Sequence, residues 1–538
     1  MRASLLALAL VAATAPAAAQ SAAMTADRAE HYELSRPARE QAELPSQPTR
    51  QVPPRRNPLA GEPGQGHRGT WSPGPSSTGG LIEQPRASAR SASRTPAVDL
   101  VFKGAQNPGA CGGCIPPDTN GDVGPNHYVQ IVNATKVSVY DKSGTLLQRF
   151  DLGRLWSSGP CRQDLGDPNV RYDEAADRWV LAQFNQTSDS GPFFLCFAIS
   201  QTGDPTGAYH LFQFHVPKFP DYFKVGVWPA TDVTHAAYYV GTNETTYTAY
   251  AFDRTKMLIG DNSASYVRFP GETNFLMPAD VDGALRPTGG GLFYTFKDNA
   301  FHSVPHDRLE LFQLTPNFVT PADSTFQRIK VINVTQFQYT VCGFFHLNCI
   351  PQRGTTQKVD AVSEWPMQRL AYRKFADHES MVGNFTVGGG TATPGAAIRW
   401  FELRNSGSDW SLFQEGTLDR NDGQNRFMGS IAIDQDGNIA LGYSISSSAL
   451  FPSVRYVTRA AGDPAGTMGP ERSVRAGHGS QTGSNRWGDY SGMAVDPTTP
   501  CRFWYTNQYY NTDSAVNWKT VVGAFTMPSC GVGPISRR

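Results

Sequence analysis

The stretch that decides the fold runs from Ile431 to Ser444 and reads IAIDQDGNIALGYS. Two short apolar runs flank an acidic turn that contains a glycine. Asp hydrogen-bonds nearby backbone amides and Gly accepts a positive φ, so this turn suits a tight hairpin between two strands. The same strand–turn–strand pattern recurs at 170–181 and 493–506, and more loosely at 139–144 and 280–283.

Short alternating runs dominate the chain from Val98 onward. They are rich in aromatic and β-branched residues and are bounded by Gly, Pro or Asp, as strands are. Clear examples are residues 128–132, 179–184, 237–241 and 292–296. Long runs with the period of a helix are scarce, so the sequence predicts an all-β protein.

The repeat has a landmark, a small or acidic residue just before or within its first strand. The landmarks are Asp118, Asp167, Gly226, Asp280, His378, Ser430 and Asp489. Most steps between them are roughly 50–60 residues, which is comparable with known propeller repeats. We therefore predict a β-propeller of about seven blades (about six to eight) over residues 98–530. The long step from Asp280 to His378 could hold a further blade or an insertion.

Radial repetition explains how a large all-β chain avoids edge-to-edge aggregation, because it leaves only short, protected edges. A pair of β-sandwich domains is the alternative architecture.

The N-terminus has the pattern of a secretory signal peptide over residues 1–19. It has a basic residue near its start, continues with an apolar run from Leu5 to Ala13, and ends with small residues before Gln20. The apolar run is too short to span a bilayer. Residues 20–97 are rich in Pro, Arg, Ser and Gly and predict a disordered tether, and residues 531–538 form a polar tail. These features predict a secreted or periplasmic protein with no membrane span.

Charge is balanced, with 47 basic and 47 acidic residues. A balanced chain has no electrostatic reason to seek nucleic acid or an anionic membrane. We therefore expect neither partner, and we expect a monomer.

Eight cysteines in an exported chain predict disulfides. We expect neighbours to pair, namely Cys161 with Cys196, Cys342 with Cys349, and Cys501 with Cys530. Cys111 and Cys114 are separated by two glycines, a spacing that suits a small disulfide loop, a redox motif or half of a zinc site. The first is favoured, because no second Cys or His pair completes four zinc ligands.

Residues that lead the innermost strands of a propeller converge on one axial mouth. The expected catalytic residues are Asp167, Glu379, Asp489 and His378, and the expected substrate-binding residues are Asp118, Asp280, Arg426, Arg486 and Tyr490. Neighbouring carboxylates push one pKa up, which gives the acid and base that glycoside cleavage requires. Arginine could clamp an acidic sugar through two hydrogen bonds.

Each of these residues also has a purely structural interpretation. Asp before Pro or Gly often caps a turn, and Asp434 and Asp436 are expected to do only that. Arg426 and Arg486 could be structural ion-pair partners. His378, between two acids, could be an acid or base, a metal ligand or a surface histidine.

The segment Asp118, Asn120 and Asp122 has the alternating oxygen ligands of a calcium loop. Val123 stands where an EF-hand-type loop needs glycine, and Val129 stands where it needs glutamate. An EF-hand is therefore excluded, whereas an irregular Ca²⁺ site stays open. We expect no other cofactor, since phosphate-loop, zincin and α/β-hydrolase motifs are absent from the sequence.

At residues 117–125, 377–380 and 486–491 the chain resembles a family of uncharacterised secreted bacterial β-propeller proteins, over residues 98–530. At the level of the fold it is similar to sialidase-like propellers that act on glycans. Residues 187–194 resemble one Asp-box turn of those proteins, with Phe193 and Phe194 in place of the final Thr-Trp. A sialidase carries three clamping arginines, and only Arg426 and Arg486 match here.

Three functions follow as hypotheses. The first is cleavage of an extracellular polysaccharide or glycoconjugate by a hydrolase or lyase. The second is binding of glycans or proteins without cleavage, through aromatic residues such as Trp228, Tyr509 and Tyr510. The third is a structural role in the cell envelope.

Overall fold

The computed structural model describes residues 24–41, 94–343, 347–389, 395–407, 409–528 and 530. The signal peptide and the polar tail predicted from the sequence lie outside these residues. The described chain is built from antiparallel units of strands, two of which are joined by one parallel pairing, with one short α-helix, α1 (Arg254–Ile259), and five single 3₁₀ turns. No helix in these segments is long and apolar enough to cross a membrane.

Four-stranded units follow one another along the chain, beginning with three near the N-terminus. Blade 1 contains β4 (Asn120–Val123), β5 (His127–Val132), β6 (Lys136–Asp141) and β7 (Leu146–Asp151). Blade 2 contains β8 (Gly166–Asp173), β9 (Arg178–Gln186), β10 (Phe193–Ser200) and β11 (Tyr209–Val216). Blade 3 contains β12 (Asp221–Trp228), β13 (Ala237–Asn243), β14 (Tyr247–Asp253) and β15 (Ser265–Glu272).

Four further units complete the set. Blade 4 contains β16 (Met277–Asp282), β17 (Gly291–Lys297), β18 (Arg308–Thr315) and β19 (Thr325–Asn333). Blade 5 contains β20 (Pro366–Lys374), β21 (Glu379–Gly388), β22 (Ala396–Asn405) and β23 (Trp410–Leu418). Blade 6 contains β24 (Asn425–Ile433), β25 (Ile439–Ser447), β26 (Leu450–Arg459) and β27 (Arg472–Arg475). Blade 7 contains β28 (Gly492–Val495), β29 (Arg502–Tyr509), β30 (Lys519–Thr526) and, from the other end of the chain, β3 (Leu100–Gln106).

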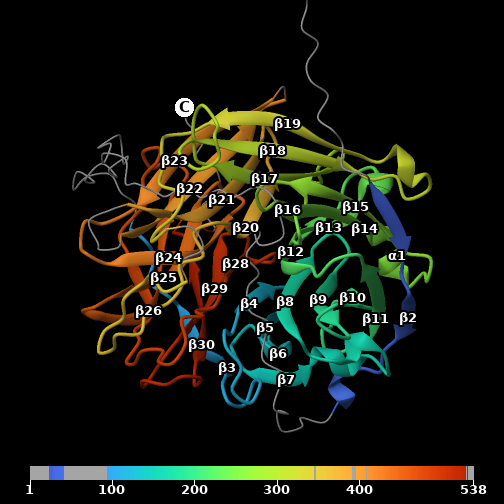
Figure 1. Ribbon diagram of the computed structural model, residues 1–538, viewed down its shortest axis with the longest axis horizontal. Helices are drawn as coiled ribbons and strands as arrows, with labels where there is room; N and C mark the ends of the chain where they lie inside the picture. The colour runs from blue at the N-terminus through green and yellow to red at the C-terminus, as the bar shows by residue number, and fades with distance from the viewer. Residues whose placement is uncertain are drawn as a thin grey trace, which may run out of the picture.

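The first strand of each blade lies at the centre of the molecule. These strands contact one another in the order β4, β8, β12, β16, β20, β24 and β28, and β28 returns to β4 (Figure 1). A Cβ on Gly492 of β28 would lie 2.9 Å from the backbone nitrogen of Gly121 in β4, so glycine permits this close approach. The ring closes, which confirms the predicted β-propeller and excludes two separate sandwiches.

A strand from the start of the domain closes the ring by pairing with the last strand. β3 pairs with β30, with Leu100 opposite Ala524 and Val101 opposite Gly523. Blade 7 therefore contains both ends of the domain, and its interstrand hydrogen bonds resist opening of the ring.

Residues 24–41 are also part of the fold, although they fall within the segment 20–97 that was predicted to be disordered. β1 (Thr25–Arg28) pairs with β15, and β2 (His31–Leu34) pairs with β11. These blue strands lie along the outer side of blades 3 and 2 in Figure 1. The short turn that follows, Ala38–Glu40, buries Ala38 completely. Residues 42–93 lie outside the described part of the chain.

The long step after Asp280 is an insertion and not a blade. It lies between β19 and β20, and its described residues, 334–343 and 347–365, contain isolated bridges in place of a sheet. The Cys342–Cys349 disulfide lies in it. The pairs Cys161–Cys196, Cys501–Cys530 and Cys111–Cys114 are disulfides too, so all four predicted pairings are confirmed.

Apolar side chains fill the space between neighbouring blades. Between blades 1 and 2, for example, Ile131, Val170 and Trp179 belong to one buried cluster. Burying one such side chain stabilises the fold by about 1.5–3 kcal/mol. The central strands are thus held by packing from outside, and their axial side chains can be polar.

Candidate functional site

Four of the seven blades share a backbone irregularity near the start of the central strand. Asp118, Asp167, Tyr222 and Met428 adopt positive φ values of 39–53°, near the start of β4, β8, β12 and β24. The strand register also shifts at the start of β8, β12 and β24. For a residue other than glycine, this left-handed backbone conformation costs about 1–3 kcal/mol of free energy, and it persists only where the surrounding structure enforces it. Sequence inspection gives no sign of this repeated strain.

One group of side chains gathers at this end of the axis, and we call it the mouth cluster. It comprises Asp118, Asp167, Asp221, Tyr222, Lys224, Arg486, Asp489 and Tyr490. The backbone nitrogen of Asp489 donates to Oδ1 of Asp118 (2.7 Å), which joins blades 7 and 1. The backbone nitrogen of Tyr222 donates to Oδ2 of Asp167 (3.2 Å), which joins blades 3 and 2.

Asn133 connects two of these acids. Its Nδ2 donates to Oδ2 of Asp118 (2.6 Å), and its Oδ1 accepts from the backbone nitrogen of Asp167 (2.9 Å). A single buried amide thus fixes the positions of both residues relative to each other. The sequence analysis did not single out Asn133.

Asp489 differs from its neighbours in having one oxygen without a partner. Its Oδ2 pairs with Nη2 of Arg486 (3.2 Å). Its Oδ1 has no hydrogen-bond partner among the described residues, although only 2 % of Asp489 is exposed. Tyr490 donates its hydroxyl hydrogen to the carbonyl of Pro168 (3.1 Å) and so holds the loop of Asp489 against blade 2.

Burial dominates the electrostatics of the mouth cluster. Burial and the nearby Asp489 carboxylate raise the pKa of Asp118, Arg486 and Lys224 act in the opposite direction, and the net result is a pKa of about 7. Burial, with Asp118 and Asp221, also raises the pKa of Asp167 well above its usual range. This pattern favours the protonated form of Asp167, whereas Asp489 is engaged in an ion pair with Arg486.

Lys224 and Asp221 were missed by sequence reasoning. Lys224 lies in β12, is fully buried, and places its Nζ 3.4 Å from the ring centre of Tyr222. The usable signal was a lysine inside an otherwise apolar strand, because a lysine there must have a compensating environment.

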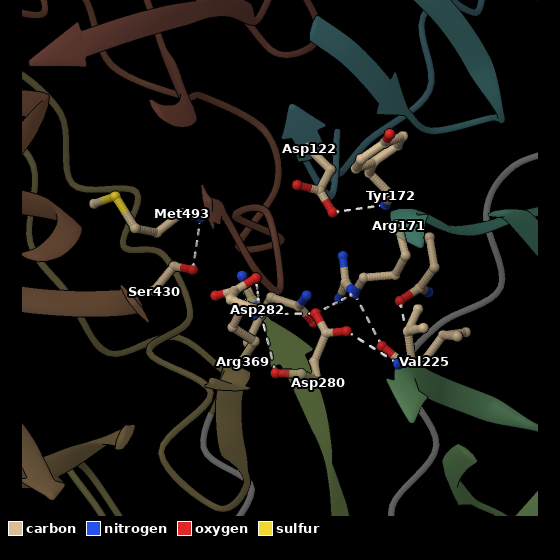
Figure 2. A network of polar contacts seen from close by, with 12 residues as sticks. Asp122, Arg171, Tyr172, Val225, Asp280, Asp282, Arg369, Ser430 and Met493 are labelled. Carbon is tan, nitrogen blue, oxygen red and sulfur yellow. Dashed lines mark hydrogen bonds and ion pairs between the residues drawn. The ribbon is translucent and has the colours of Figure 1, made fainter. Parts of the chain in front are cut away.

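Asp280 does not belong to the mouth cluster. Its Oδ1 accepts from the backbone nitrogen of Val227 (3.0 Å). Its Oδ2 lies 3.1 Å from Nε of both Arg171 and Arg369, which surround it in Figure 2. Asp280 is the fourth residue of β16. Asp118 precedes β4, and Asp167 is the second residue of β8, so these two acids lie nearer the start of their strands. Its contacts are those of a structural ion-pair network.

Side chains of this second network join adjacent central strands. Asp122 accepts from the backbone nitrogen of Tyr172 (2.9 Å), and Ser430 accepts from that of Met493 (2.9 Å), as Figure 2 shows. Most neighbouring central strands lack a backbone ladder, so these oxygens satisfy amide groups that would otherwise be unpaired. Many axial polar residues therefore hold the blades together.

His378 and Glu379 lie apart from the mouth cluster, contrary to the expected convergence. They follow β20, in its hairpin with β21, whereas Pro366 at the start of β20 contacts the hydroxyl of Tyr222 (3.3 Å). The nine residues of β20 span roughly 25–30 Å. The error arose because this landmark opens the second strand of blade 5 and not the first.

The contacts of His378 and Glu379 are local. Nδ1 of His378 lies 2.8 Å from Oδ1 of Asp377, and the imidazole stacks on Phe375 at 4.6 Å. Glu379 accepts a hydrogen bond from the hydroxyl of Tyr372 (2.6 Å). These contacts stabilise the end of blade 5.

Arg426 is also engaged elsewhere. Its Nη2 pairs with Asp422 (2.7 Å) and its Nε with Glu471 (3.0 Å), and 1 % of its side chain is exposed. The structural interpretation of this arginine therefore fits the structure, and the expected clamp on an acidic sugar does not.

The three candidate calcium ligands point into different environments. Asp118 lies in the mouth cluster, Asn120 accepts from Nη1 of Arg171 (3.1 Å), and Asp122 bonds to blade 2. Over the described ranges, no three His, Cys, Asp or Glu side chains are grouped as metal ligands.

Loops cover the mouth cluster. The Trp365 ring lies 4.5 Å from that of Tyr222, and the backbone of Asp360 in the insertion donates to the carbonyl of Asn485 (2.9 Å). As a result, Asp118, Asp167 and Asp489 are 0 %, 4 % and 2 % exposed. The aromatic residues offered as a binding surface, Trp228, Tyr509 and Tyr510, are buried as well.

Comparisons with known proteins add little to this geometry. No family model matches the chain, and no curated protein does. An α-L-arabinofuranosidase from Fusarium graminearum is 10 % identical, with 81 % of this chain and 98 % of that one covered and a TM-score of 0.35. A Trypanosoma rangeli sialidase mutant with trans-sialidase activity is 9 % identical, with 69 % and 58 % covered and a TM-score of 0.33. BamB from Moraxella catarrhalis is 8 % identical, with 79 % and 100 % covered and a TM-score of 0.33. Such distant likenesses say nothing about activity, and the fold rests on the strand topology.

Proposed function

We propose that this protein is exported and cleaves a glycosidic bond of an extracellular glycan at the mouth cluster. The observation that carries the proposal is the contrast between two nearby carboxyl groups. Asp167 is deeply buried beside other acids, and Asp489 is paired with Arg486 but keeps one oxygen without a partner.

The contrast supplies the two groups that glycoside cleavage needs. Protonated Asp167 gives its proton to the leaving oxygen as the glycosidic bond breaks. The Asp489 carboxylate either removes a proton from an attacking water, or itself attacks the sugar to form a glycosyl ester. In the second case Asp167, now deprotonated, takes a proton from a water molecule that hydrolyses the ester and releases Asp489. Asn133 and Asp118 hold both groups in place through the hydrogen bonds described above.

Access requires the covering loops to move, because the carboxyl groups are nearly inaccessible. The contacts to be broken include the Asp360–Asn485 backbone hydrogen bond and a bond from Nε2 of Gln352 to the carbonyl of Gln481 (2.9 Å). Closure of such loops over a substrate excludes water from the site.

The test is a panel of extracellular polysaccharides, assayed for new reducing ends and for unsaturated products. We expect Asp489→Asn and Asp167→Asn to lower kcat by at least about 100-fold, since each removes an acid or base. Asp436→Asn, in the exposed hairpin turn between β24 and β25, is the matched control and should keep full activity. If the wild type cleaves nothing, or if the folded Asp489→Asn protein turns over normally, the proposal is wrong.

One observation favours a second function, which is binding of a glycan or protein without cleavage. The mouth carboxyl groups are nearly inaccessible, as the carboxyl groups of structural ion clusters are. In that case a ligand found on a glycan array would bind equally well to wild type and to Asp489→Asn, and no product would form.

A further inference from the structure

Lys224 is a fully buried lysine within a ring of acids. β12 begins at Asp221, and the strand register shifts between Asp221 and Lys224, next to the positive φ of Tyr222. The shift lies where β12 meets the mouth cluster. The ammonium group donates to the backbone carbonyls of Tyr222 (2.9 Å) and Phe223 (3.3 Å).

Two aromatic faces hold the same ammonium. Its Nζ lies 3.4 Å from the ring centre of Tyr222 and 4.1 Å from that of Tyr490. A cation over an aromatic face is attracted by the ring, and more strongly when water is excluded. The carbonyls and rings therefore fix the position of this charge without exposing it.

Charged groups face Lys224 from four blades. They are the acids Asp167 of blade 2, Asp118 of blade 1, Asp489 at the start of blade 7, and Asp221 of its own blade 3. An isolated buried ammonium is prohibitively costly, so the carboxylates must compensate it. By the same reasoning, the ammonium must stabilise their charged forms.

We propose that Lys224 is the electrostatic positioning residue of the mouth cluster, an interior cation that determines how many of its acids are charged. Its Nζ donates to the carbonyl of Tyr222, and the backbone nitrogen of Tyr222 donates to Oδ2 of Asp167, so one residue connects the ammonium to that carboxyl group. Because Lys224 is fully buried, it acts on the site through the neighbouring acids Asp167 and Asp118. Burial lowers the pKa of Lys224 to about 8 and the surrounding acids oppose that shift, so it remains a cation near neutral pH.

This inference rests on the proposed function and deepens it. Its test measures the protonation of the carboxyl groups and not glycan cleavage, so the inference about Lys224 and the proposed activity can fail separately. Difference infrared spectroscopy with ¹³C-labelled aspartate follows carboxyl protonation against pH, and Asp118→Asn and Asp167→Asn identify the bands. In Lys224→Met, we expect the midpoints of Asp118 and Asp167 to rise by about one pH unit or more. Lys224→Arg, which keeps the charge, should bring them back toward the wild-type values.

The matched control is Lys136→Met. Lys136 is likewise buried and pairs with Asp151 in blade 1, outside the mouth cluster. The Lys136→Met variant should leave the titration midpoints of Asp118 and Asp167 unchanged. Unchanged midpoints in a folded Lys224→Met protein would overturn the proposal.

A second measurement covers the case in which Lys224→Met does not fold. The ¹⁵Nζ resonance of Lys224 in the wild type should report a charged ammonium at about pH 6 and its loss above about pH 8, in line with the lowered pKa. A neutral amine at about pH 6 would equally overturn the inference.

Discussion

At the scale of single residues, the mouth cluster shows how the same amino acid takes different roles in one fold. Asp434 caps a hairpin turn, with its Oδ1 accepting from the backbone nitrogens of Asp436 (2.9 Å) and Asn438 (2.8 Å), as its sequence context predicts. Asp280 joins blades through two arginines. Asp167 also joins two blades, through the backbone nitrogen of Tyr222, and Asp489 pairs with Arg486 but keeps one buried oxygen without a hydrogen-bond partner among the described residues.

Asp118 gives a prediction for stability against pH. Its pKa is about 7 in the folded protein and near 3.8 when exposed, so the folded state binds more protons between these values. Stability due to this group is therefore greatest at low pH and is lost as the pH rises from about 4 to about 7. Relative to Asp118→Asn, the wild type should lose on the order of a few kcal/mol of unfolding free energy across this window.

Urea unfolding of both proteins at a series of pH values measures the effect. Asp436→Asn serves as the control, since its exposed carboxyl lies in a turn. If the unfolding free energies of the wild type and Asp118→Asn change in parallel with pH, then Asp118 is charged throughout the window.

At the scale of elements, the central strands are joined by side chains. Arg369 in β20 pairs with Asp280 (3.1 Å) and with Asp282 (2.7 Å) of β16, and all three are nearly inaccessible. The parallel pairing of β16 with β20 places these residues side by side, with Asp280 opposite Ala371. The pairing of β16 with β20, which makes blades 4 and 5 neighbours, thus also places these charged side chains at the axis.

Replacing Arg369 should be costly for this reason. Arg369→Met leaves Asp282 without its ion-pair partner in a buried setting, and we expect the unfolding free energy to fall by about 3–5 kcal/mol. Arg328→Met removes an arginine that is 47 % exposed and pairs with Glu310 (3.3 Å), so it should cost no more than about 1 kcal/mol. Denaturant unfolding of the two variants compares them, and equal losses would contradict this assignment.

At the scale of the whole molecule, two N-terminal segments have different roles. β3 completes blade 7 and closes the ring, whereas β1 and β2 extend blades 3 and 2 that are already four-stranded. Residues near β3 also contact blade 6, since the hydroxyl of Tyr456 donates to the carbonyl of Pro96 (2.5 Å). Closure therefore depends on residues 94–106 and not on residues 24–41.

Two truncated chains test this distinction. A chain that begins at residue 94 should fold, with a thermal midpoint only a few degrees lower. A chain that begins at residue 107 lacks β3 and should aggregate or unfold, because blade 7 then exposes the edge of β30. Thermal unfolding and size-exclusion chromatography provide the readout, and a stable monomer starting at residue 107 would refute the role of β3.

The all-β class, the repeat and the four disulfide pairs follow from the amino-acid sequence, because they depend on local turn chemistry, alternation and near neighbours along the chain. The same patterns also indicate Asp118, Asp167, Arg486 and Asp489, which lie at or before the start of central strands. Which polar residues meet follows from the folded arrangement, because it depends on the position along a strand at which each side chain reaches the axis. The folded arrangement separates Asp280, His378, Glu379 and Arg426 from the mouth cluster, and it brings in Lys224, Asp221 and Asn133, whose proximity arises from closure of the ring.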